Sequence, residues 1–168
     1  TFISKAVQRL TKLQNLYLAN SPITYDNIAT DWEDATSEYA KQYADEELSW
    51  SNLKDLTDVE LYNCPKLTQI PEFVYDLPEL QLLNVACNKG ISADQLTADW
   101  KRLADDEDTG PKVQILYLGY NNLEKFPESE SLRKMVKLGL LDCVHNNVNH
   151  LEAFGTDVKL SDLMLSYN

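Results

Sequence analysis

The sequence predicts an α/β solenoid in which short parallel strands line a concave face, while helices and irregular turns form the convex face. Three observations support this fold class. A pattern of apolar residues, L-x-x-L-x-L, recurs six times along the 168 residues. The copies are joined by segments with shared apolar positions, and two of these contain insertions with helical spacing. Because such units bury their apolar faces only by stacking, we expect one domain over residues 1–168.

Each copy is expected to contribute one short strand. The last two apolar residues of the pattern are two positions apart, so they lie on the same face of an extended chain. An alternation of this kind is typical of a strand with one buried face. The inward pairs are Leu16 and Leu18, Val59 and Leu61, Leu83 and Val85, Leu116 and Leu118, Leu141 and Cys143, and Leu163 and Leu165.

The segments that leave the strands also share a pattern. Three residues after each inward pair comes an Asn or a small substitute, and these residues are Ser21, Cys64, Asn88, Asn121, Asn146 and Asn168. The segments 67–80 and 123–138 then repeat apolar positions around Pro71 and Pro127. We expect these apolar side chains to point inward from the convex side.

Together these motifs resemble the leucine-rich-repeat family, and the resemblance covers nearly the whole chain. It implies that each Asn satisfies backbone groups of the turn and that neighbouring copies form a ladder, in which Cys64 and Ser21 are tolerated substitutes. The lengthened repeats look like those of bacterial proteins that are often secreted or surface-anchored. An extracellular or cell-surface location is therefore implied by the resemblance, as is a binding function.

Two intervals between copies exceed the usual repeat length of about 20–29 residues, and we predict helical insertions near 24–50 and 92–110. The segments 23–32 and 91–100 align without a gap. Ser92 and Gln95 form a capping box, of which Thr24 and Asn27 are a weaker version. Apolar stripes at helical spacing follow, with Leu96, Trp100 and Leu103 in one insertion and Ile28, Trp32, Ala35, Tyr39 and Tyr43 in the other.

Both insertions have alternative interpretations. A Trp stripe can bind a cofactor or a partner, but aromatic residues at helical spacing usually face a core, and we expect core packing. Gly110 and Pro111 are expected to end the second helix. The acidic tract 105–108 suggests calcium, but it lacks the alternating ligands and the glycine of a calcium loop, which favours a solvated helix end.

The composition bounds the function. A formal net charge of −12 argues against binding to nucleic acid or to anionic lipid. No apolar run approaches the roughly 18 residues of a membrane-spanning helix. The chain does not open with a signal peptide or lipidation motif, although it begins abruptly with Thr1 and is expected to be a fragment of a longer chain. Without polar end caps, the solenoid is also expected to associate end to end.

No enzyme, metal site or cofactor is expected. The three cysteines, Cys64, Cys87 and Cys143, match no zinc pattern. In stacked strands Tyr120 lies between Cys87 and His145. The distance between this thiol and this imidazole is therefore too long for a thiolate–imidazole pair. Cys143 occupies an inward position and is expected to be inert, and a disulfide between Cys64 and Cys87 is disfavoured because they face opposite ways.

The outward side chains of the strands are the candidate binding surface. They include an apolar row, formed by Leu82, Ile115 and Leu140, that a soluble protein rarely exposes without a cover or a purpose. The predicted binding residues are Tyr17, Glu60, Tyr62, Leu82, Asn84, Ile115, Tyr117, Tyr120, Leu140, Asp142, His145 and Tyr167. The alternative is that a flanking loop, or another part of a larger chain, covers the row.

The expected partner is a protein or peptide held by the tyrosines and the apolar row. Carbohydrate is an alternative ligand, because Tyr rings stack on sugars and Asp or Asn side chains accept hydrogen bonds from hydroxyls. A third possibility is a structural spacer whose repeats only project other domains. We do not expect a nucleic acid as a partner, and we expect no transmembrane segment in this chain.

Overall fold

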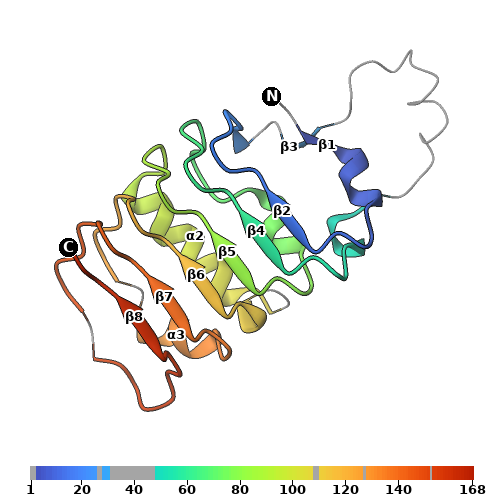
Figure 1. Ribbon diagram of the computed structural model, residues 1–168. Coiled ribbons are helices and arrows are strands. Elements are labelled where there is room, and N and C mark those ends of the chain that lie inside the picture. The colour runs from blue at the N-terminus through green and yellow to red at the C-terminus, as the bar shows by residue number, and fades with distance from the viewer. Residues whose placement is uncertain (1–2, 26–27, 31–47, 108–109, 127, 152) are drawn as a thin grey trace, which may run out of the picture.

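The computed structural model describes residues 3–25, 28–30, 48–107, 110–126, 128–151 and 153–168. Its main feature is a six-stranded parallel sheet in the order β2-β4-β5-β6-β7-β8 (Figure 1). The strands are short, and their bounds are β2 Asn15–Tyr17, β4 Asp58–Glu60, β5 Leu82–Asn84, β6 Ile115–Tyr117, β7 Leu140–Asp142 and β8 Asp162–Met164. Each predicted copy of the repeat therefore supplies one strand, which confirms the solenoid.

Equivalent positions of the sequence pattern pair with one another across the sheet. The first inward residue of every copy pairs with that of the next, as in the series Leu16, Val59, Leu83, Leu116, Leu141 and Leu163. Most of these side chains are fully buried and form one continuous core with the apolar residues of the convex segments. Stacking thus supplies the apolar surroundings that one copy lacks by itself.

The two end strands of the sheet depart from the expected burial. Leu163 on β8 is 37% exposed, and Leu16 on β2 is half-buried. A strand at the end of a sheet has a neighbouring copy on one side only, so its inward side chains are covered less completely. The prediction that every strand has one buried face is therefore wrong for Leu163.

The second insertion forms a helix on the opposite side of the sheet from the viewer in Figure 1. This helix, α2, spans Ala93–Asp105, and the Ser92 hydroxyl at its N-terminus accepts a hydrogen bond from the Gln95 N–H at 3.2 Å. Leu96, Trp100 and Leu103 are buried, as their spacing predicts. The helix ends before Gly110, which instead begins a separate 3-10 turn, Gly110–Lys112.

The first insertion does not begin as the predicted helix. Residues Ile28–Thr30 form strand β3, which pairs in parallel with β1, Ile3–Ser4. Ile28 and Thr30 are β-branched and suit an extended backbone, and pairing with a distant segment outweighs the weak capping signal at Thr24. The other residues of the predicted stripe, from Trp32 to Tyr43, lie outside the described residues.

Short helical segments complete the convex side. A second α-helix, α3, spans Ser129–Lys134 and contacts α2. The 3-10 helices are Lys5–Arg9, Trp50–Asn52, Glu72–Asp76 and the turn at Gly110–Lys112. Several of their apolar residues, among them Trp50, Phe73 and Val74, are buried in the same core as the strands.

A ladder of Asn side chains closes the turns of the last four copies, and three of these side chains are buried. The Asn88 amide donates to the carbonyls of Leu61 at 2.8 Å and Val85 at 2.9 Å, and its oxygen accepts from the Cys64 N–H at 2.7 Å. Asn121, Asn146 and Asn168 donate to backbone carbonyls in the same manner. Cys64 takes the place of an Asn by directing its thiol at the Leu18 carbonyl at 3.2 Å.

Candidate binding surface

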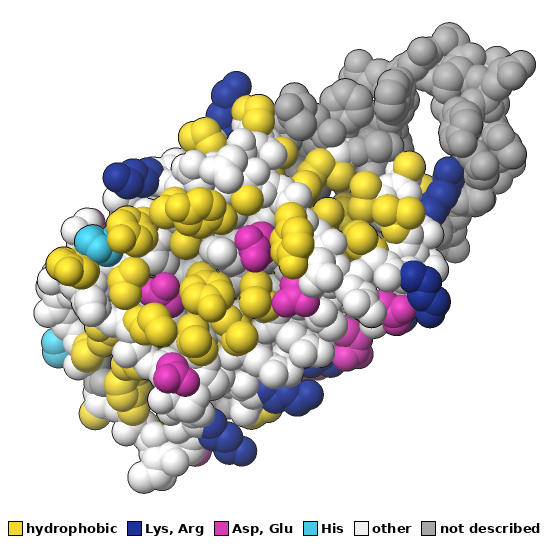
Figure 2. Space-filling model, viewed as in Figure 1, with side chains coloured by type: hydrophobic (Ala, Val, Ile, Leu, Met, Phe, Trp, Pro, Cys, Tyr) yellow, Lys and Arg dark blue, Asp and Glu magenta, His cyan; other side chains and the backbone are white. Residues whose placement is uncertain are grey.

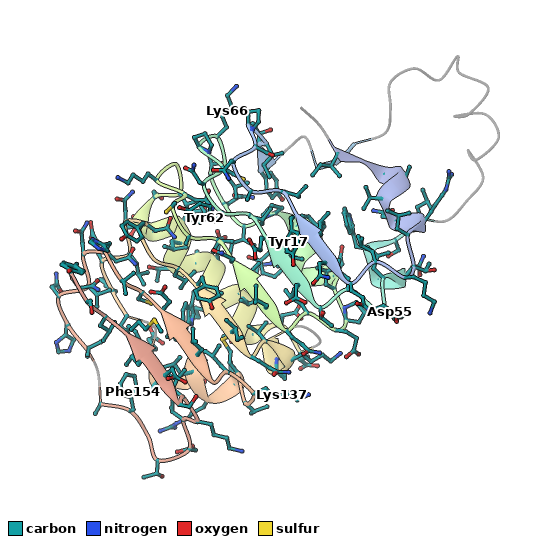
Figure 3. The ribbon with its side chains drawn as sticks, viewed as in Figure 1. Tyr17, Asp55, Tyr62, Lys66, Lys137 and Phe154 are labelled. Atoms are coloured by element: carbon teal, nitrogen blue, oxygen red, sulfur yellow. The ribbon has the colours of Figure 1, made fainter. Side chains whose placement is uncertain are left out.

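The outward side chains of the six strands, together with those of the next residues up to the turn, form a surface that we call the strand face. All the predicted binding residues lie on it, and none of them is buried. Figure 2 shows hydrophobic side chains across this face with acidic side chains among them. In Figure 3, Tyr17 lies over β2 and Tyr62 near the end of β4. Whether these residues bind a ligand stays a prediction.

An apolar row crosses the centre of the strand face. Leu82, Ile115 and Leu140 pair directly across β5, β6 and β7, so their side chains lie next to one another. All three are half-buried, so solvent reaches part of each side chain. On the same line of paired residues a carboxylate flanks the row on each side, at Asp58 on β4 and Asp162 on β8.

A second row runs parallel to the first. It consists of Glu60, Asn84, Tyr117 and Asp142, which pair across β4, β5, β6 and β7. Asn84 and Asp142 each accept a hydrogen bond from the backbone N–H two residues later, at 3.1 Å and 2.9 Å. These bonds orient the side chains where the strands end. In this row too, neutral residues lie between two carboxylates.

The carboxylates of the strand face lie on segments that contain no Lys or Arg. The strand segments 14–20, 57–63, 81–87, 114–120, 139–145 and 161–167 contain neither Lys nor Arg. Among the described residues, Asp58, Glu60, Asp142 and Asp162 form no ion pair, whereas acidic residues elsewhere do, as in the pairs of Arg102 with Glu72 and Lys112 with Glu79. The strand face is therefore acidic and apolar.

Asp58 and Asp162 are absent from the set of binding residues predicted from sequence. Both occupy the third position of their copies, the position that also supplies the apolar row. The signal was present, because aligning the copies shows an acid at each end of the three apolar residues. Only the pairing of strands shows that these two acidic residues flank a single line of side chains.

Aromatic rings stack along one margin of the strand face. The ring of His145 lies between those of Tyr120 and Tyr167, with centroid distances of 4.1 Å and 4.2 Å and interplanar angles of 18° and 11°. These residues occupy the same left-handed turn position, with φ of 57° for Tyr120, 52° for His145 and 61° for Tyr167. Because the backbone repeats, the side chains leave it in the same direction and their rings meet face to face.

The same turn position carries other interactions in the earlier copies. Asn63 donates a side-chain hydrogen bond to Asn20 at 2.8 Å, and both residues also have positive φ. A hydrogen bond between the side chains of Tyr62 and Cys87, together with electrostatic repulsion from Cys87, raises the pKa of Tyr62 above its usual value. Side chains of neighbouring copies therefore interact at several points along this margin.

The cysteines lie as the sequence predicts. All three are free thiols, with Cys64 and Cys143 buried and Cys87 half-buried. Burial raises the pKa of both Cys64 and Cys143, so neither forms a thiolate readily. The parallel register places Tyr120 between Cys87 and His145, so this thiol and imidazole are not a catalytic pair.

Neither a metal site nor a membrane-spanning helix is found among the described residues. Over those residues, no group of three or more His, Cys, Asp or Glu side chains is arranged to hold a metal ion. Within the same ranges, no helix combines the length and the apolar character needed to cross a membrane.

Comparison with known proteins identifies close structural neighbours. A leucine-rich repeat protein from Bacteroides thetaiotaomicron VPI-5482 is 78% identical over 96% of this chain, with a TM-score of 0.90. Another, from Bacteroides eggerthii DSM 20697, is 58% identical over 95% of it, with a TM-score of 0.88. The chain spans only 20% and 26% of these two proteins. No protein-family model matches the chain, and no curated protein does.

Proposed function

Because the chain is a leucine-rich-repeat solenoid, we propose that it binds a polypeptide segment on its strand face and that binding, not catalysis, is its function. The observation that carries this proposal is the apolar row of Leu82, Ile115 and Leu140, which is half-exposed on adjacent strands. Contiguous apolar surface on a soluble protein usually marks an interaction site. Tyr117 beside the row adds an aromatic ring with a polar end, a residue type enriched in binding hot spots.

The ring stack favours a polypeptide over a glycan. A sugar packs on the open face of an aromatic ring, but both faces of His145 and one face of Tyr120 are occupied by neighbouring rings. The edges and hydroxyls of these side chains remain suited to the polar groups of a peptide. The glycan alternative depends on the more open rings of Tyr17, which is 63% exposed, and Tyr167, which is 76% exposed, and a glycan array tests it directly.

We further propose that this binding takes place at the cell surface or outside the cell. The support is the likeness to lengthened bacterial leucine-rich-repeat proteins. Protease treatment of intact cells that express the full-length protein tests the location. Digestion of the protein in intact cells supports it, whereas protection until the cells are lysed contradicts it.

Peptide selection provides the test of the binding surface. A random peptide library displayed on phage is selected against the immobilised chain, and the selected peptides are measured by fluorescence anisotropy. The double variant Ile115→Ser with Tyr117→Ala removes the centre of the strand face. Because two truncated hot-spot side chains cost about 1 kcal/mol or more each, we expect affinity to fall about thirtyfold.

The matched control is Lys137→Ala, an exposed residue at the margin of the strand face in Figure 3. This variant should bind the selected peptides as the unchanged chain does. Circular dichroism establishes that both variants keep their fold. Equal affinity of the double variant and the control contradicts the proposal, because the peptides then bind another surface.

A further inference from the structure

We infer that the polypeptide bound by the strand face is cationic and extended, with two Lys or Arg side chains four residues apart around a central apolar residue. This inference rests on the proposed function and specifies its partner. It is carried by one arrangement, in which an apolar centre is bounded by carboxylates on both sides. Asp58 and Glu60 flank the apolar centre on β4, and Asp142 and Asp162 flank it on β7 and β8.

Among the residues that the structure describes, no ion pair compensates the charge on this surface. The segments that form it contain neither Lys nor Arg, and in Figure 2 the basic side chains lie around its margin. In Figure 3, Lys66 and Lys137 both lie at that margin. Three of these carboxylates, Asp58, Glu60 and Asp142, are half-buried, and Asp162 is exposed. Carboxylates without cationic partners repel one another, and a basic ligand relieves this repulsion. The net charge of −12 also attracts a cationic segment from a distance.

Hydrogen bonds do not neutralise these carboxylates. Asp58 accepts from the Thr57 hydroxyl at 2.7 Å and Asp162 from the Ser161 hydroxyl at 2.8 Å. Asp142 accepts from the backbone N–H of Val144. Such bonds orient each side chain and leave its negative charge in place, so the carboxylates stay available to form charge-assisted hydrogen bonds with Lys or Arg.

The spacing of the carboxylates selects the spacing of the cations. Strands of a sheet lie about 4.8 Å apart, so Glu60 and Asp142, three steps apart in one row, are separated by about 14 Å. An extended peptide advances about 3.4 Å per residue, and its alternate side chains share one side. Residues i and i+4 therefore span about 14 Å on the same side.

The residue between the two cations faces the centre of the surface. With cations at i and i+4 over Glu60 and Asp142, the side chain at i+2 lies over Asn84 and Tyr117, beside the apolar row. Tyr117 can contact both the central apolar side chain and a neighbouring guanidinium, which favours Arg as one of the cations. The pattern is thus basic, apolar, basic at alternate positions.

The test uses three blocked, fluorescein-labelled nonapeptides measured by fluorescence anisotropy in low salt. Their central residues are Arg-Ser-Leu-Ser-Arg, Glu-Ser-Leu-Ser-Glu, and Arg-Arg-Ser-Leu-Ser, which has the same composition with the wrong spacing. We expect the first to bind at least about tenfold more tightly than either of the others. Its affinity should fall as salt is raised, because salt screens the ion pairs.

Two double variants, each of which removes two negative charges, test whether the affinity depends on the carboxylates of the strand face. Glu60→Gln with Asp142→Asn removes two charges from the strand face and keeps the acceptor for the Val144 N–H. Glu124→Gln with Glu128→Gln removes two charges from exposed residues outside it. We expect the first variant to lose about tenfold in affinity for the correctly spaced peptide and the second to lose almost none.

The outcomes separate this inference from the proposed function. If all three peptides bind alike, if none binds, or if both charge variants behave alike, the cationic pattern is wrong. The proposed function still stands when library-selected peptides of another charge lose affinity with Ile115→Ser and Tyr117→Ala. If no selected peptide responds to that double variant, the proposed function fails as well.

Discussion

The Asn ladder makes a quantitative prediction for the variant Asn88→Ala. Asn88 is fully buried, and its side chain is the hydrogen-bond partner of the Cys64 N–H and of the Leu61 carbonyl. The Val85 carbonyl also accepts from Asn88, but it keeps a second partner in the Asn121 amide at 3.0 Å. Truncation to Ala therefore leaves two buried backbone groups without their partner.

The expected cost follows from the two orphaned groups. Each buried donor or acceptor without a partner costs about 1–3 kcal/mol, so Asn88→Ala should lower the free energy of unfolding by about 4 kcal/mol. In a chain of this length, about 1 kcal/mol corresponds to a shift in Tm of about 2–4 °C. We therefore expect a Tm roughly 8–16 °C below that of the unchanged chain.

Thermal unfolding followed by circular dichroism measures this shift, and tryptophan fluorescence in urea provides a second probe because Trp50 and Trp100 are buried. The matched control is Asn147→Ala, which removes an exposed Asn from the same kind of turn. This control should unfold within about 1 °C of the unchanged chain, since its side chain is solvated. Equal Tm values for the two variants would refute the view that the ladder holds the copies together.

Two further predictions concern packing and thiol reactivity. Gly90→Ala should destabilise the chain by about 1–3 kcal/mol, because the added Cβ would lie 2.6 Å from the backbone oxygen of Leu67; an unchanged urea midpoint would contradict this. Iodoacetamide should modify Cys87 in the folded chain but not Cys64 or Cys143, because burial raises the pKa of both thiols and restricts access to them. Mass spectrometry of partly labelled protein measures this order, and equal labelling of all three cysteines would contradict it.

The strands and their inward faces were predictable because they depend on local pattern and on repetition. Leu83 and Leu116 are two copies of the same position, and both are buried as the alternation predicts. The second helix was predictable for a similar reason. Its cap at Ser92 and its stripe at Leu96, Trp100 and Leu103 are features of a single segment.

Features that join distant segments were not predictable from local pattern. Strand β3 at Ile28–Thr30 exists because the edge at Ile3–Ser4 pairs with it, and its segment alone has a helix-like cap. The burial of Leu163 was overestimated for a related reason, since an inward position is covered only as far as neighbouring copies extend. Burial depends on what packs on both sides of a strand.

The features of the candidate surface also fall into those that the sequence predicted and those that only the structure showed. The repeat in the sequence determined which residues point outward, including the apolar row and the tyrosines, because alternation along a strand depends only on backbone geometry. The tertiary structure decided which of them meet: it stacked His145 between Tyr120 and Tyr167, and it placed carboxylates at both ends of the apolar row. Contact between copies is set by strand register and by the turn conformation that every copy shares. These are properties of the assembled sheet and are absent from any single repeat.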